Sequence, residues 1–236
     1  QRLRTIPDPP VILFLKGAIE ALQNPFAIAV VGTREPTPWG QRLAERFGAK
    51  FAECGATVIS GLAVGCDAAA HIGCLNSNGK TIAVLAHGLQ MVYPAAHKGL
   101  AQQIIESGGC LVSEYPPGVR GHPNYFVERD RIQSGLSVGV VVVETDVKGG
   151  TMHTVKACEA QNRVLACLAH PQKLWKESKT QGNQMLIREK RAMAIGTEAD
   201  LQIYTQRLRE RLNGGAALPI KGWDDANLQM HLFSED

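Results

Sequence analysis

The stretch AVVGTREPTPWG, residues 29–40, contains the transition that decides the fold: an apolar run ending in Gly32, a polar turn, and the start of a helix. A buried strand followed by a glycine turn and a helix is the repeating unit of parallel α/β proteins. The turn does not match the dinucleotide fingerprint G-x-G-x-x-G, because Thr33 and Arg34 follow the glycine. The stretch therefore predicts a strand, a turn and a helix whose loop binds something other than a dinucleotide.

Five further apolar runs repeat this pattern along the chain. They are ATVIS (56–60), TIAVLA (81–86), CLVSE (110–114), VGVVVVE (138–144) and RVLACLA (163–169). Helical segments are expected between and after them, at 39–54, 66–77, 97–107, 126–136, 151–161 and 198–212. Near-continuous apolar strands that alternate with helices are typical of a parallel sheet covered on both faces. We therefore predict an α/β three-layer fold with a mostly parallel sheet and helices on both faces; the resemblance described below implies that it is of the extended Rossmann-like type.

Length and charge predict one main domain with a local anion site. A chain of 236 residues with 44% hydrophobic residues can bury one sizeable core. We expect an N-terminal arm at 1–25 that packs on the core, a main α/β domain at 26–212, and a tail at 213–236 in which no winged helix is evident. The formal charge of +3 is too small for a protein that coats nucleic acid with its whole surface.

The cysteines and the apolar runs indicate the compartment. The six cysteines form no C-x-x-C pair and no cluster with histidine at zinc spacing, so reduced, buried thiols are expected. No run approaches 18 apolar residues, the length of a membrane-spanning helix. The sequence predicts a soluble, cytoplasmic protein with no metal site, no cofactor and no membrane partner.

Arg34 is the first candidate binding residue. Ligands of parallel α/β sheets bind beyond the carboxyl ends of the strands, and Arg34 lies just after the first core strand. A helix that begins near Pro38 would point free N–H groups at the same place, and a guanidinium beside a helix N-terminus is a good phosphate receptor. The alternative interpretation is a surface arginine paired with Glu35 or Glu45.

The loop SGLAVGCD and the helix that follows it support the same location. Ser60, Gly61 and Gly65 predict a tight strand-to-helix turn that a ligand can approach closely. Asp67 falls in the first helical turn, where it can cap backbone N–H groups, and His71 lies one turn later. We predict that Asp67 and His71 are structural residues near the site.

The segment NYFVERDRIQSG combines an aromatic residue with arginines at a loop-to-helix junction. Phe126 can stack on a nucleobase while Arg129 and Arg131 contact phosphates, which is the usual way to hold single-stranded nucleic acid. The alternative interpretation is that Phe126 anchors the helix in the core and the arginines pair with Glu128 and Asp130.

The loop DVKGGTMHT is another candidate for phosphate binding, although it is not a Walker A sequence. Lys148, Gly149, Gly150 and Thr151 precede or begin a helix. No nucleophile elbow, no H-E-x-x-H motif and no pair of carboxylates suited to acid–base work is evident. We therefore predict binding rather than catalysis, with no catalytic residues.

Seven motifs together resemble the DprA/Smf family of DNA-processing proteins over about residues 5–205. They are VVGTREPTPWG, VISGLAVGCDAAAH, TIAVLAHGLQMVYP, LVSEYPPG, FVERDRIQSGLS, VVVVE and KGGTMHTVKACEAQNR. The resemblance implies a Rossmann-like domain that binds single-stranded DNA without strong sequence preference. It also implies a homodimer that hands DNA to the RecA recombinase during natural transformation, with no catalytic turnover.

Loop position and the resemblance select the same site. The predicted DNA- or phosphate-binding residues are Gly32, Thr33, Arg34, Ser60, Gly61, Gly65, Phe126, Arg129, Arg131, Lys148, Gly149, Gly150 and Thr151. The chain departs from the family pattern F-P-x-R-N-R, because Glu128 and Asp130 place carboxylates where phosphates approach. Lysine or arginine is frequent in the family where Ala95 and Pro123 stand, and the nearest basic residues here are Lys98 and Arg120.

Two other functions stay open. One is a small-nucleotide sensor or an enzyme that resembles the cytokinin-activating phosphoribohydrolases, which carry P-G-G-x-G-T-x-x-E. In this chain KGGTMHTVKACE lacks the later glycine, and Glu159 lies too far along to serve as that motif's glutamate. The other is an interaction scaffold whose anion pocket has decayed, which the acidic residues at 128 and 130 permit.

Overall fold

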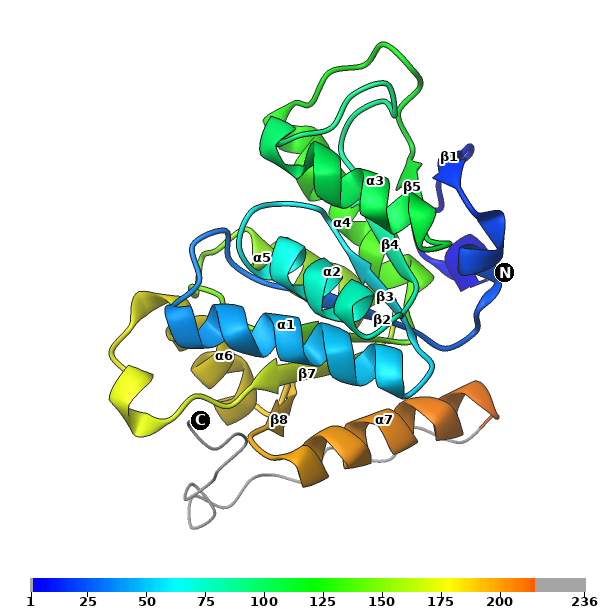
Figure 1. The fold of residues 1–236 in the computed structure, drawn as a ribbon. Coiled ribbons are helices and arrows are strands. Elements are labelled where there is room, and N and C mark those ends of the chain that lie inside the picture. The colour runs from blue at the N-terminus through cyan, green and yellow to red at the C-terminus, as the bar shows by residue number, and fades with distance from the viewer. Residues whose placement is uncertain (1, 215–236) are drawn as a thin grey trace.

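The computed structural model describes residues 2–214 and contains one eight-stranded sheet between two helical layers (Figure 1). The strand order is β1-β5-β4-β3-β2-β6-β7-β8, and every neighbouring pair is parallel except β1 with β5. The strands are β1 (Phe14–Gly17), β2 (Ala27–Val31), β3 (Thr57–Ser60), β4 (Thr81–Leu85), β5 (Cys110–Ser113), β6 (Gly139–Val142), β7 (Val164–Leu168) and β8 (Met193–Ile195). The predicted α/β Rossmann-like fold is confirmed.

The helices cover both faces of the sheet. On one face lie α1 (Pro38–Glu53), α2 (Cys66–Asn76), α3 (Lys98–Glu106) and α7 (Glu198–Leu212), and on the other α4 (Pro123–Leu136), α5 (Thr151–Ala160) and α6 (Ser178–Arg188). Strand β2 shows why two layers are needed. Its side chains alternate between the faces, and all five are buried, with Ile28 and Val30 packed on the α1 side and Val31 on the α4 side.

Helix α1 forms where its sequence pattern predicts. The Thr37 hydroxyl caps it by accepting a hydrogen bond from the Gly40 N–H at 3.0 Å, and Pro38 occupies the first turn. Leu43, Phe47 and Phe51 recur at helical spacing, and all three are buried. The helix ends just before Gly55, whose φ of +80° continues the chain into β3.

Strands β1 and β8 and helix α6 were not predicted. Polar contacts hold helix α6 against the sheet, so its sequence shows no clear apolar stripe from which a helix could be predicted. The buried Asn183 amide donates to the carbonyls of Val142, Val143 and Leu168, and its oxygen accepts from the Thr145 N–H. Such contacts leave no hydrophobic period in the sequence.

The first 25 residues lie against the sheet and helix α4. They include the short helices η1 (Arg2–Thr5) and η2 (Ile19–Gln23) and the edge strand β1. A Cβ at Gly135 of α4 would lie 2.6 Å from the Leu3 side chain, so the glycine admits η1. The predicted boundary at residues 25–26 stays a prediction, and the predicted tail lies outside the described residues from 215 onward.

The sheet has its topological switch point between β2 and β6. From β2 the order runs through β3, β4 and β5 to one side, whereas β6, β7 and β8 lie on the other. The loop after β2 leads to α1 on one face, and the loop after β6 leads to α5 on the opposite face. Such divergence opens a crevice at the carboxyl edge, where ligands bind in folds of this kind. No helix within residues 2–214 has the length and apolar character needed to cross a membrane.

Candidate functional site

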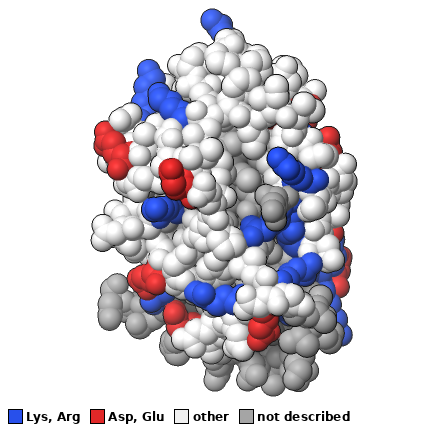
Figure 2. Space-filling model, turned by 90° about the vertical axis from the view of Figure 1, so that its right-hand side faces the viewer, with Lys and Arg blue, Asp and Glu red and all other residues white. Residues whose placement is uncertain are grey.

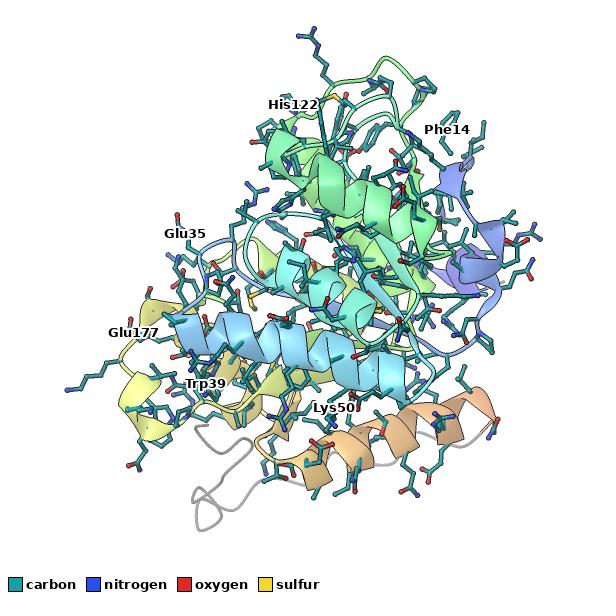
Figure 3. The ribbon with its side chains drawn as sticks, in the orientation of Figure 1. Phe14, Glu35, Trp39, Lys50, His122 and Glu177 are labelled. Carbon is teal, nitrogen blue, oxygen red and sulfur yellow. The ribbon has the colours of Figure 1, made fainter. Side chains whose placement is uncertain are left out.

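A cavity of about 840 Å³ lies at the switch point. Its lining comes from the loops after β2, β3, β4, β5 and β6, from helix α4, and from the starts of α2, α5 and α6. The predicted residues that line it are Gly32, Thr33, Arg34, Phe126, Arg129, Gly149, Gly150 and Thr151, together with Asp67. Figure 3 labels two further lining residues, Glu35 and His122, which lie on the same side of the molecule.

A buried carboxylate fixes the loop that carries Arg34. Glu144, which has no exposed side-chain surface, follows β6 and accepts hydrogen bonds from the Thr37 N–H at 2.7 Å and the Thr37 hydroxyl at 2.6 Å. Its carbonyl also accepts from the Thr33 N–H at 2.8 Å. A Cβ at Gly40 would lie 2.3 Å from the carboxylate, so the glycine makes room for it. The loop is therefore held at both ends while Arg34 stands between them.

Arg34 is exposed and available to an anion. Among the described residues no carboxylate lies within 4.0 Å of its guanidinium, so the alternative pairing with Glu35 or Glu45 is not observed. The guanidinium carbon lies 5.2 Å from the centroid of the Phe126 ring. This cation–π contact holds the charge at the mouth of the cavity.

Phe126 lies on the cavity and contacts Tyr93 edge-on, with ring centroids 5.9 Å apart. Phe126 belongs to none of the buried clusters of the core, and Tyr93 is 52% exposed. The two rings and the guanidinium of Arg34 form an aromatic and cationic rim. A nucleobase can stack on such a surface whatever its identity, because every base has a π face.

Arg129 forms part of the cavity wall rather than an exposed contact. It is 5% exposed, its Nη1 donates to the Val84 carbonyl at 2.5 Å, and its Nε lies 3.2 Å from the Asp130 carboxylate. A Cβ at Gly61 would lie 2.0 Å from Nη1, so only glycine fits under this guanidinium. Burial raises the pKa of Asp67, and the charge of Arg129 opposes that rise.

Ser60, Gly65 and His71 lie behind the lining. The Ser60 hydroxyl donates to the Val30 carbonyl at 2.7 Å. His71 is buried with Nδ1 2.6 Å from the Thr81 hydroxyl, and burial lowers its pKa to about 3, so the ring is neutral at neutral pH. Gly65 has a φ of +81°, and a Cβ there would lie 2.6 Å from the carbonyl oxygens of the β2–α1 loop.

Two predicted cations are not brought to the cavity. Arg131 points toward other partners, with Nε 2.6 Å from Asp8 and Nη2 2.8 Å from Glu114. Its observed partners are therefore not the neighbouring carboxylates of the alternative interpretation. Lys148 is exposed but is not among the lining residues.

The start of α5 supplies backbone donors. Gly149, Gly150 and Thr151 line the cavity, and within the described residues the N-cap of α5 makes no side-chain hydrogen bond. The N–H groups of Gly149, Met152 and His153 donate to backbone carbonyls, so the donors left for an anion are those of Gly150 and Thr151. Uncapped N–H groups at a helix N-terminus attract anions through their partial positive charge. This arrangement agrees with the phosphate-binding role predicted for the loop.

The structure adds cavity residues that the sequence did not single out as contacts. Arg120 and Lys179 contribute charge, and Lys179 lies 3.2 Å from Asp146 and 3.8 Å from Glu35. Arg120 had a weak signal as a nearby basic residue, whereas Lys179 belongs to the unpredicted helix α6. Asp130 also lines the cavity, and burial, with Asp67 nearby, raises its pKa to about 7 against the opposing charge of Arg129.

Other chemistries find no support in the described part of the chain. No group of histidine, cysteine and acidic side chains within residues 2–214 could hold a metal ion. Five of the six free cysteines are buried, and burial raises the pKa of the Cys66 thiol. Glu159 is absent from the cavity lining and pairs with Arg191 at 2.7 Å.

Comparisons with known proteins give a consistent result. The family model for DNA recombination-mediator protein A matches residues 1–206. Protein Smf of Escherichia coli is 42% identical over 164 residues, which cover 70% of this chain and 44% of that protein. The structure of DNA processing protein A from Helicobacter pylori, which addresses single-stranded DNA binding by that protein, matches with a TM-score of 0.79 and 25% identity over 89% of this chain and 93% of the other.

A second solved structure agrees. DprA from Streptococcus pneumoniae matches with a TM-score of 0.77 and 33% identity, over 86% of this chain and 69% of that one. The chain spans less than half the length of Escherichia coli Smf. Because the family model covers most of the sequence and protein Smf of Escherichia coli is 42% identical over 70% of this chain, the chain belongs to the DNA recombination-mediator protein A family, which includes the DprA and Smf proteins.

Proposed function

We propose that this chain binds single-stranded DNA in the cavity at the carboxyl edge of the sheet, without strong sequence preference. The observation that carries the proposal is that the rim formed by Arg34 and Phe126 lines the same cavity as the uncapped start of α5. Stacking on Phe126 holds a base, while Arg34 and the N–H groups of α5 hold the adjacent phosphate. None of these contacts reads the hydrogen-bonding edge of a base, so binding is tolerant of sequence.

The proposal includes a role for the bound DNA. We propose that the protein delivers single-stranded DNA to the RecA recombinase in natural transformation and recombination, acts as a homodimer in the cytoplasm, and performs no chemistry on the DNA; membership of the DNA recombination-mediator protein A family supports the role in recombination. Light scattering tests the dimer. RecA filament assembly on an oligonucleotide, measured with and without the protein, tests delivery, and a protein that leaves the assembly rate unchanged contradicts it.

An oligonucleotide titration tests DNA binding directly. Fluorescence anisotropy with a short labelled oligo-dT at low salt should show binding that weakens as salt rises, because neutralised phosphates release counterions. Arg34→Ala should reduce affinity about tenfold or more, corresponding to about 1.5–3 kcal/mol for a hydrogen bond to a charged group. Arg188→Ala is the matched control, because Arg188 is exposed and lies nine residues along α6 from Lys179, roughly 14 Å away.

Two results contradict the proposal. One is a wild-type protein that does not bind oligo-dT at low salt. The other is an Arg34→Ala protein that binds as tightly as the wild type. Base released from a nucleoside monophosphate by the wild type would instead support the enzyme alternative.

A further inference from the structure

A second concentration of positive charge lies at the amino edge of the sheet, opposite to the cavity. It consists of Arg2, Arg163, Arg209 and Arg211, which we call the amino-edge arginine cluster. Figure 2 looks onto the side of the molecule that carries the N-terminus and the end of α7, and Lys and Arg side chains gather over its middle and lower part.

Backbone carbonyls hold the four guanidiniums in place. Arg2 donates to the carbonyls of Pro25 and Leu136, which precede β2 and β6. The Nη2 of Arg163 donates to the Arg2 carbonyl at 3.3 Å. Arg211 donates to the Asn162 carbonyl, just before β7. Arg209 donates to the Cys54 carbonyl at 2.6 Å, with its guanidinium carbon 4.4 Å from the centroid of the Phe26 ring. Three segments of the chain, η1, the residue before β7 and the end of α7, therefore bring like charges together at the amino edge of the sheet.

Within residues 2–214 the cluster has no acidic counterpart. Among residues 2–214 no carboxylate lies within 4.0 Å of any of the four guanidiniums, whereas Arg131 and Arg191 each pair with two. The buried Nε of Arg163 also has no hydrogen-bond partner. Burial and the neighbouring charge of Arg163 lower the pKa of Arg2 to about 10. Unpaired, partly buried like charges are unfavourable, and an external anion would relieve them.

We propose that the amino-edge arginine cluster binds the phosphate backbone of a second segment of the DNA strand whose first segment occupies the cavity. This inference rests on the proposed function. Guanidiniums anchored through some of their N–H groups can present the others to phosphate oxygens, often in pairs. The cluster offers phosphate contacts without base stacking, because its one aromatic ring, Phe26, is 6% exposed and lies under Arg209.

The path between the two sites suits a flexible single strand. A strand of five residues such as β2 separates the edges of the sheet by about 16 Å. Because helices cover both faces of the sheet, the path over the surface is longer than this, and a flexible single-stranded backbone can follow it, whereas a stiff duplex cannot bend so sharply at low cost. A long oligonucleotide should therefore reach both sites, and a short one only the cavity.

The test compares two oligonucleotide lengths. Oligo-dT of about six nucleotides should occupy the cavity alone, and one of roughly 40 nucleotides should reach the cluster as well. In the variant with Arg163→Gln, Arg209→Gln and Arg211→Gln, the slope of log affinity against log salt should fall by about 2 for the long oligonucleotide, since each phosphate contact contributes about 0.7. The short oligonucleotide should bind the variant as it binds the wild type.

Two further variants keep the test decisive. Arg191→Gln removes one charge that is already paired with Glu159 and Glu189, and it should leave the slope unchanged. If the triple variant does not fold, Arg209→Gln with Arg211→Gln changes only the end of α7, and it should lower the slope by about 1.4.

The outcomes separate this inference from the proposed function. If wild type binds both oligonucleotides and the cluster variants keep the wild-type slope, the inference is wrong and the cavity function stands. If wild type binds neither, both are wrong. Binding of labelled poly-glutamate that the cluster variants lose, with an unchanged slope for long DNA, would assign the cluster to an acidic protein and overturn the inference.

Discussion

The two edges of the sheet carry positive charge in different ways. At the carboxyl edge, Arg34 and Lys179 share the cavity with Glu35, Asp67, Asp130 and Asp146, so cations and carboxylates alternate around one space. At the amino edge, four arginines have no carboxylate within 4.0 Å among the described residues, and backbone carbonyls hold them. A mixed lining can orient a ligand, whereas an unmixed cluster can only attract one. The difference indicates that the cavity orients a bound nucleotide, whereas the amino-edge arginine cluster makes a general electrostatic contact with phosphates.

The difference also concerns rigidity. The position of the cavity loop depends on the buried carboxylate of Glu144, which accepts two hydrogen bonds from Thr37 and packs against Gly40. The arginines of the cluster are held by single contacts to the main chain and are partly exposed. Substitutions near the cavity should therefore change folding and affinity together, whereas substitutions in the cluster should change mainly the salt dependence.

The largest effect is expected from Gly40→Ala. The new methyl group would lie 2.3 Å from the Glu144 carboxylate, and overpacking of this kind should lower the free energy of unfolding by about 3 kcal/mol. Urea denaturation measures the loss. The control is Gly99→Ala in α3, where a Cβ meets no atom within 4 Å and should stabilise the helix slightly. A Gly40→Ala protein as stable as the wild type would show that the loop is not rigidly held.

The next effect is expected from Phe126→Ala. Loss of the stacking surface should weaken binding of short oligo-dT by about 1–3 kcal/mol, which is a factor of roughly 5 to 150, and leave the salt slope nearly unchanged. Anisotropy titrations at several salt concentrations measure both quantities. Tyr115→Ala is the control, because Tyr115 stacks on Tyr125 with centroids 4.3 Å apart and is not a cavity residue. If Tyr115→Ala and Phe126→Ala lost equal affinity for short oligo-dT, stacking on Phe126 in the cavity would not be what holds the base.

The smallest effect is expected from Asp130→Asn. Since the pKa of Asp130 is raised to about 7, its carboxyl is neutral below that pH and negative above it, and the new charge repels phosphate. Affinity of the wild type for short oligo-dT should fall as pH rises through 7. Asp130→Asn should bind about fivefold more tightly at pH 8, equivalent to about 1 kcal/mol.

The pH dependence has a defined sign for stability as well. Between pH 3.8, the usual pKa of the carboxyl, and about 7, the folded protein binds more protons at Asp130 than the unfolded chain, so this residue's contribution to stability falls as pH rises through that window. His122 and His153 also line the cavity, so the difference between wild type and Asp130→Asn isolates the carboxyl. A variant whose affinity keeps the full wild-type pH dependence would contradict this assignment.

The sequence by itself determined the sheet and the core of the cavity. Apolar runs of four to five residues predict buried parallel strands, and the carboxyl ends of parallel strands meet at one edge. The sequence pattern therefore predicts one site for Gly32, Arg34, Phe126 and the Gly149–Thr151 loop, and all of them line the cavity. Strand β1, strand β8 and helix α6 were missed, because edge strands are short and Asn183 holds α6 through hydrogen bonds that leave no period.

Only the tertiary structure decided which arginines are free. Arg34, Arg129 and Arg131 look alike in sequence, yet Arg34 meets no carboxylate among the described residues, Arg129 is buried under the cavity, and Arg131 pairs with Asp8, 123 residues away. The amino-edge arginine cluster likewise gathers residues from the two ends of the described chain and from its middle. Local patterns specify strands and helices because these are stabilised within a few residues, whereas the partner of a charge depends on segments that only folding brings together.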